Sequence, residues 1–201
     1  MKAKTCNDIF EKAIDYYHIN NEIDSSYPNP FEKERFKFLL FEKCWIDTVQ
    51  WHLEDIIRNP NLDPKNGLAI KHRIDSSNQK RTDIVEKIDD YYFHVFKENS
   101  NTESRINTES PGWVVDRLSI LNLKIFHMNE QTERKDVTQE HILNCSEKLN
   151  ILKQQKIDLS LSFDQLLQEY KSGVKKMKVY RQMKMYNDST LNPELYQKNN
   201  S

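Results

Sequence analysis

The spacing of hydrophobic residues between positions 142 and 170 is the feature that most limits how this chain can fold. Apolar side chains recur there at alternating intervals of three and four residues, which is the heptad spacing of packed α-helices. The seam consists of Ile142, Cys145, Leu149, Leu152, Leu159, Phe163, Leu166 and Tyr170, and Lys156 interrupts it. This seam must be covered, so we expect bundle packing within the chain or a contact with a second copy through this helix. Gly173, Met177 and Tyr180 continue the register, so we expect the helix to run past the glycine.

Prolines and polar loops divide the rest of the chain into four further helical segments. We expect these helices over residues 5–18, 30–59, 64–97 and 111–131, and the fifth helix from residue 138 onward. Side chains that can accept a hydrogen bond from the first turn predict N-caps at Thr5, Asp63 and Thr138. Neither a strand pattern nor an internal repeat is found in the sequence.

These patterns together predict an all-α, single-domain antiparallel helical bundle of about five main helices, with no β-sheet. We assign residues 1–172 to the bundle. Residues 173–201 are expected to form a basic helical extension followed by a disordered C-terminal tail.

The scarcity of glycine excludes the glycine-rich phosphate loops. Three of 201 residues are glycine, whereas a dinucleotide fingerprint or a P-loop needs several within about eight residues. The 30 basic and 31 acidic residues nearly balance, so no global field attracts nucleic acid and we expect no DNA partner. Three isolated cysteines and an N-terminus without an apolar stretch predict a cytoplasmic protein with reduced thiols and no secretion signal.

The most informative polar residue is Arg81, because it falls at the centre of the apolar arc of the third helix. Arginine keeps its charge, so a buried one needs a carboxylate or phosphate partner. Either a structural ion pair inside the bundle or a clamp for an anionic ligand satisfies this need, and Asn78 lies beside it. In the second helix, Glu42 falls in the middle of the predicted apolar arc, with His52 at its edge and Asp55 beside His52.

The fourth helix is apolar nearly all round, which predicts a central position. Asp116 and His127 share one side of it, whereas Arg117 lies on a polar stripe that faces solvent or the mouth of a cleft. At its start, Ser110 and Gly112 flank a proline, and free amides and the helix dipole at such a place attract anions. A well-capped helix explains the same residues, but a glycine here also indicates close approach to the backbone.

Three segments of the chain carry a family resemblance: WHLEDIIRNPNLDP at 51–64, RIDSSNQKRTDIVEKID at 73–89 and ESPGWVVDRLSILNLKIFHM at 109–128. Together they resemble an uncharacterised bacterial family catalogued as domain of unknown function 4254. The resemblance covers roughly residues 5–185 and implies a cytoplasmic, all-helical protein. It also implies a genomic neighbourhood of lipopolysaccharide or surface-glycan glycosyltransferases, and so a role in that synthesis.

The first functional hypothesis is a pocket for a phosphorylated or nucleotide-sugar-like ligand. The anion would be bound by Asn78, Arg81, Ser110, Gly112 and Arg117. His52 would act as acid or base with Asp55 beside it, for transfer or hydrolysis at a phosphoryl or glycosyl centre. His127 with Asp116 is the other such pair. No metal ligand is assigned, and the cofactor stays open.

The second hypothesis is a metal-dependent enzyme like the all-α nucleotide pyrophosphohydrolases, which bind magnesium through paired acidic motifs. EKID at 86–89 matches the second half of that pattern, whereas HLED at 52–55 matches the first half poorly. The third hypothesis is a non-enzymatic interaction module. The segment 171–186 carries six basic residues and no acid, so residues 174–186 would contact a membrane surface or a partner.

Overall fold

Five long helices make up most of the chain. The computed structural model describes residues 1–25, 27–185 and 188–196. Its helices are α1 (Ala3–Asn20), α2 (Phe36–Ile57), α3 (Pro64–Phe96), α4 (Pro111–Glu133), α5 (Gln139–Lys171) and the short α6 (Pro193–Tyr196), with a 3₁₀ turn at Lys97–Asn99. Within these described residues the only β-type pairing is an isolated bridge between Arg105 and Lys175. The all-α, single-domain prediction with five main helices is confirmed.

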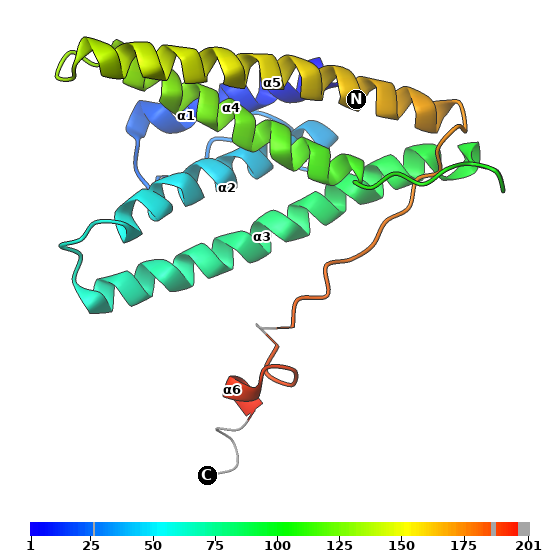
Figure 1. Cartoon of the computed structure of the whole chain (residues 1–201). Helices are drawn as coiled ribbons and strands as arrows, with labels where there is room; N and C mark the ends of the chain where they lie inside the picture. Colours follow the sequence, from blue (N-terminus) through cyan, green and yellow to red (C-terminus); the bar gives the residue numbers. More distant parts are fainter. Residues whose placement is uncertain (26, 186–187, 197–201) are drawn as a thin grey trace.

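The helices α3 and α5 lie along opposite edges of the bundle, and α1, α2 and α4 lie between them (Figure 1). A short loop joins α4 to α5, and these two helices run side by side. Each long helix contributes to one core, whose fully buried members include Tyr17, Phe41, Tyr92, Leu118 and Phe163. Among the described residues, no helix combines the length and the hydrophobicity needed to cross a bilayer.

The first helix is capped by a residue of another helix. α1 begins at Ala3, and the Ala3 N–H donates to Asp164 Oδ1 of α5 at 2.8 Å. The predicted cap at Thr5 is therefore wrong, because a distant carboxylate satisfies the free amide. The caps predicted at Asp63 and Thr138 are confirmed, since each side-chain oxygen accepts a first-turn amide.

The second helix starts at Phe36, so the prediction of a start at Pro30 is wrong. Asn29 accounts for the delay. Its Oδ1 accepts the Phe31 N–H at 3.1 Å, and its Nδ2 donates to the Phe38 carbonyl at 3.1 Å. These bonds hold a turn where the sequence predicted the first helical residues.

The fifth helix ends at Lys171, so its predicted continuation past Gly173 is wrong. Gly173 has a φ of 75°, a conformation that residues with a side chain rarely adopt. A Cβ at this position would clash with the Asn99 carbonyl oxygen, and the Gly173 carbonyl accepts the Ser104 hydroxyl at 2.6 Å. The loop after α3 thus terminates α5, and residues 174–185 continue as non-helical chain instead of the expected basic helix (Figure 1).

Polar contacts hold this basic segment on α3. Arg181 donates to Asp90 at 2.6 Å, and Lys184 Nζ donates to Thr82 Oγ1 at 2.9 Å. Some basic side chains of this segment are therefore bound to α3 within the molecule. The predicted disordered end of the tail lies in part outside the described residues.

Candidate functional site

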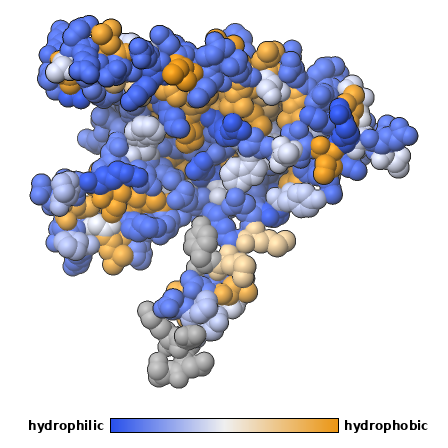
Figure 2. All heavy atoms as spheres, viewed as in Figure 1, coloured by the Kyte–Doolittle hydropathy of each residue, from blue (hydrophilic) through white to orange (hydrophobic). Residues whose placement is uncertain are grey.

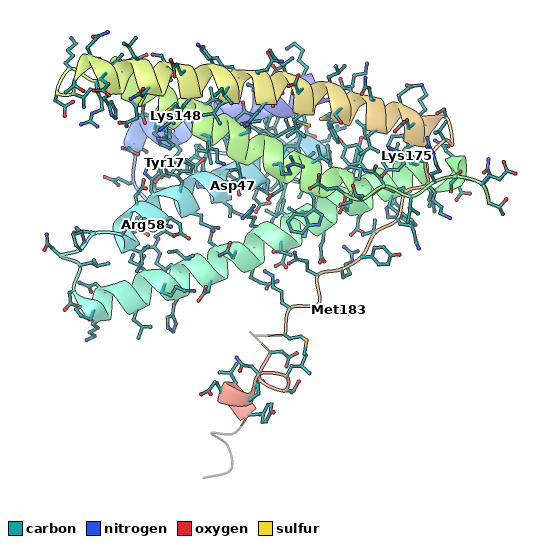
Figure 3. All side chains as sticks on the ribbon, in the orientation of Figure 1. Tyr17, Asp47, Arg58, Lys148, Lys175 and Met183 are labelled. Atoms are coloured by element: carbon teal, nitrogen blue, oxygen red, sulfur yellow. The ribbon has the colours of Figure 1, made fainter. Side chains whose placement is uncertain are left out.

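The centre of the bundle holds a cluster of buried charges. Lys43 and Asp47 of α2 are both fully buried and form an ion pair, and Lys43 Nζ also lies 2.9 Å from Asp116 Oδ1 of α4. Arg81 of α3 binds the same Asp116 carboxylate through two hydrogen bonds of 2.7 and 2.6 Å. Figure 3 shows Asp47 in the middle of the molecule. Two cations thus balance two carboxylates in the largely buried centre of the bundle, which is the condition for keeping charges inside a protein.

Arg81 forms the structural ion pair that was one of its two predicted roles. Its side chain is 28% exposed, so one edge of the guanidinium binds Asp116 while the other remains accessible. Arg81 lines a cavity of about 610 Å³ together with Arg117 and Lys124. Arg117 in turn pairs with Glu109 at 2.9 Å. Arg81 and Arg117 therefore share a cavity as predicted, but both are already paired with protein carboxylates.

The pKa values of the two buried carboxylates, Asp47 and Asp116, are shifted in opposite directions. Burial raises the pKa of Asp47, although Lys43 and the Ser119 hydroxyl, 2.5 Å from Asp47 Oδ2, oppose the shift. Burial would also raise the pKa of Asp116, but Lys43 and Arg81 together hold it below its ordinary value. Asp116 is therefore the firmly ionised member of the pair.

A protein carboxylate already fills the anion site predicted at the start of α4. The Gly112 N–H donates to Asp89 Oδ1 and the Ser110 hydroxyl donates to Asp89 Oδ2, each at 2.6 Å. Ser110 is the N-cap residue, but its side chain makes no cap hydrogen bond itself. Arg81 does not join these groups, because it pairs with Asp116. The amides expected to bind a ligand are satisfied by α3 instead.

The acidic residues of the predicted magnesium motif have separate partners. Asp89 holds the start of α4, whereas Glu86 lies 3.4 Å from Arg181 of the C-terminal segment. Asn78, the other predicted ligand-binding residue on α3, accepts from Gln50 Nε2 at 2.8 Å. These side chains thus stabilise contacts between elements.

Three histidines from three helices come together at one end of the bundle. One ring nitrogen of each of His18 (α1), His52 (α2) and His127 (α4) lies within 4.8 Å of the other two. The ring centroids are 5.3–5.4 Å apart in every pair, and the rings are inclined by 61–80° to one another. All three Nε2 atoms are buried and lack a hydrogen-bond partner within the part of the chain described. The rings therefore surround a common point.

The Nδ1 atoms orient two of these rings. His18 Nδ1 lies 2.7 Å from the Ile14 carbonyl oxygen, and His127 Nδ1 lies 2.8 Å from Glu130 Oε2. The Ile14 carbonyl can only accept a hydrogen bond, and so can Glu130 when it is ionised. In the neutral rings Nδ1 therefore carries the hydrogen, and the Nε2 lone pair stays free. Such an outer hydrogen bond is the usual companion of a metal-binding histidine. Glu130, rather than the predicted Asp116, is thus the carboxylate that orients His127.

Aromatic side chains pack against the same rings. Tyr17 stacks on His52 with centroids 5.0 Å apart, and Trp51 stacks on His127 at 4.8 Å, both at an interplanar angle of 12°. Figure 3 shows Tyr17 of α1 and Lys148 of α5 near the same end of the bundle. The stacking restricts the ring orientations.

A cavity of about 780 Å³ opens beside the histidines, a size within the usual range for small-molecule sites. Asp55 lines it, as predicted for a neighbour of His52, together with Lys124 of α4 and Lys148 of α5. Neither lysine forms an ion pair with any residue that the structure describes. Hydrophilic side chains cover most of the rim of the face seen in Figure 2, and hydrophobic ones gather in its middle.

Lowering the pH from about 7.5 to 5 is expected to destabilise the metal-free protein. Burial lowers the pKa of both His18 and His52 below the ordinary value. Unfolded histidines take up a proton near pH 6.5 while the folded rings resist it, so the unfolded state binds more protons. The histidine contribution is therefore present above about pH 6.5 and is lost as the pH falls through the folded pKa.

Urea denaturation in EDTA at pH 7.5, 6.5 and 5.5 measures this effect. The double variant His18→Gln/His52→Gln should flatten the dependence, whereas the exposed His72→Gln should keep it. A free energy of unfolding that does not change between pH 7.5 and 5.5 would contradict the expected role of the two rings.

Sequence reasoning missed His18, Lys43 and Asp47. His18 follows the buried Ile14 by four residues, so its place on the apolar side of its helix was the available signal. Lys43 and Asp47 are also four residues apart, a spacing typical of exposed ion pairs. The prediction that Glu42 lies in the middle of the buried face of α2 is wrong. The buried face is rotated toward Lys43 and Asp47.

A family model described as "Protein of unknown function (DUF4254)" matches residues 37–179. That range contains His52, His127 and the buried charge cluster, whereas His18 precedes it. No curated protein and no solved structure matches the chain.

Proposed function

This chain belongs to the DUF4254 family of proteins of unknown function, and we propose that it is a metal-dependent enzyme that acts on a phosphorylated small molecule. Three histidines from three helices carry this proposal. One ring nitrogen of each lies within 4.8 Å of the others, and all three Nε2 atoms are buried without a hydrogen-bond partner among the described residues. Imidazole nitrogen suits Zn²⁺, and three neutral histidines with one open position are a common ligand set of catalytic zinc.

The geometry accommodates such an ion after a small adjustment. The nitrogens lie within 4.8 Å of one another. A tetrahedral zinc with bonds of about 2.0–2.1 Å would hold its ligand atoms about 3.4 Å apart, so the most distant pair would have to approach by about 1.4 Å. Side chains that line a cavity can make this movement. The lowered pKa of His18 and His52 also favours the neutral form that binds metal.

The residues around the cavity suit an anionic substrate. His18, His52 and His127 would hold the ion as neutral ligands, and a zinc ion bound there would keep its positive charge and supply Lewis-acid chemistry. Lys124 and Lys148 would bind the phosphate oxygens, because both line the cavity and neither is paired with a described carboxylate. Asp55 lines the same cavity and would accept a proton.

Zinc titration of the EDTA-treated protein tests the metal centre. We expect one Zn²⁺ per chain, and His52→Ala or His127→Ala should weaken binding by more than about 100-fold. Glu130→Gln should cost less, about 10–100-fold, because it removes only an outer hydrogen bond. His72→Ala is the matched control, since His72 is exposed on α3 and should leave the affinity unchanged. Isothermal titration calorimetry measures all four variants.

Activity is measured with p-nitrophenyl phosphate and the zinc-loaded protein. Hydrolysis should disappear in His127→Ala, and Lys124→Gln should raise KM more than it lowers kcat. Lys153→Gln, an exposed change on α5, serves as the charge control. Stoichiometric zinc binding that persists in both His52→Ala and His127→Ala would overturn the proposed centre. Zinc-loaded protein that binds no phosphate ester would overturn the proposed substrate class.

A further inference from the structure

A second, smaller cavity adjoins the cavity of the three histidines. It has a volume of about 290 Å³ and its wall includes Asp47, Gln50 and Arg81. Trp51 and Asp55 line both cavities. A ligand held at the histidines could therefore extend past these two side chains into the smaller space. That volume is at the lower end for small-molecule sites, so it suits one part of a ligand.

Two buried oxygen atoms of the residues in this wall accept no hydrogen bond from any described residue. Asp47 Oδ1 and Gln50 Oε1 are both buried and lack a hydrogen-bond partner within the described residues. The other polar atoms of the same side chains are bonded: Asp47 Oδ2 to Lys43 and Ser119, and Gln50 Nε2 to Asn78. Buried acceptors are seldom left unsatisfied in native proteins. Both residues line the same cavity, so a donor bound there could satisfy these oxygens.

The charges nearest Asp47 favour a neutral donor over a cation. Farther along the same wall, Glu54 pairs with Arg58, and Asp55 lines the side shared with the larger cavity. Lys43 and Arg81 already balance Asp47 and Asp116, and Arg81 Nε lies 3.6 Å from Asp47 Oδ1. A second positive ion would meet both of these cations at short range. A hydroxyl group fits better, because it can donate to Asp47 or Gln50 and accept from the exposed edge of Arg81.

We infer that this smaller cavity is a subsite for the hydroxyl-bearing, polyol part of the ligand. Trp51 and Ile120 supply an apolar wall for its carbon skeleton. As a description of the substrate, the inference rests on the proposed function, which places the phosphate end at the histidines. Binding of a polyol by Asp47 and Gln50 itself requires no metal, so the two can be tested separately.

Saturation-transfer NMR on the full chain tests the subsite, with myo-inositol and D-glucose as probes and cyclohexanol as the control. Both polyols should receive saturation in the EDTA-treated and in the zinc-loaded protein, and cyclohexanol should receive much less. Gln50→Met keeps the side-chain length and removes Oε1, together with the Nε2 donor to Asn78, so it should weaken polyol binding at least 10-fold. Gln154→Met, on the exposed face of α5, is the matched control and should bind as the wild type does.

Zinc affinity and thermal melting of Gln50→Met are measured in parallel. The affinity should match the wild type, and the melting temperature should fall only slightly, through loss of the hydrogen bond from Nε2 to Asn78. Polyol binding that depends on Gln50 but persists in His127→Ala supports the subsite even where zinc binding fails. Equal saturation of wild type and a folded Gln50→Met, or none of either polyol, would overturn the subsite and leave water as the donor. Such a result with intact zinc binding would overturn the subsite without contradicting the proposed metal centre.

Discussion

Replacing Lys43 with methionine is expected to lower the free energy of unfolding by about 3–5 kcal/mol. Lys43 is the cation that Asp47 and Asp116 share, and its side chain has no exposed surface. Methionine has a similar length, so it fills the space but leaves Asp47 with the Ser119 hydroxyl and an Arg81 nitrogen at 3.6 Å. A domain of this size is typically stable by about 5–15 kcal/mol, so the variant should come close to unfolding.

Two controls separate the buried charge from loss of packing. Lys37→Met places the same substitution on an exposed position of α2 and should change stability by less than about 0.5 kcal/mol. Lys43→Met/Asp47→Leu removes the orphaned carboxylate as well and should recover part of the loss, because apolar replacements of buried pairs are often tolerated. Urea denaturation followed by circular dichroism measures each variant. A loss below about 1 kcal/mol for Lys43→Met alone would contradict the buried cluster.

Gly112→Ala is expected to cost about 3 kcal/mol, from overpacking and from a strained hydrogen bond. A Cβ at this position would lie 2.6 Å from the Val85 carbonyl oxygen and 2.7 Å from the Asp89 carboxylate. The backbone of α3 and the start of α4 would have to separate. That movement would also stretch the bond from the Gly112 N–H to Asp89, which caps α4.

Gly67→Ala is the matched control, since Gly67 also lies in the first turn of a helix. A Cβ there would meet the Leu62 and Ile57 side chains at 3.7 and 3.9 Å, which is ordinary contact. Alanine is the better helix former, so this variant should be neutral or more stable by up to about 1 kcal/mol. If both glycine variants melt at the wild-type temperature, the close approach of α3 and α4 is not a rigid one.

Local signals predicted most of the fold. The caps at Asp63 and Thr138 act on amides two or three residues away, so the sequence around them is sufficient. Predictions failed where a distant residue decides the outcome. Asp164 caps α1 from another helix, and the Asn99 carbonyl lies where a side chain at Gly173 would be. Contacts of this kind depend on the assembled bundle and leave no local pattern.

The residues of the candidate site also fall into those that local sequence could predict and those that it could not. Arg81 could be identified because a charge on an apolar helical face needs a partner, and the structure supplies Asp116. Lys43 could not, because its spacing from Asp47 also describes an exposed ion pair. His52 and His127 were both singled out from sequence, but their meeting with each other and with a third helix is a tertiary contact.

The origin of the three histidines on α1, α2 and α4 has a consequence for the rate of unfolding. An ion bound to all three would cross-link segments that are far apart in the chain, and closing such loops restricts the unfolded ensemble. α1 could then not detach from the bundle without breaking a metal bond. The metal-bound protein would open more slowly and resist proteolysis at its first helix, a gain in kinetic stability that an equilibrium melt alone would miss.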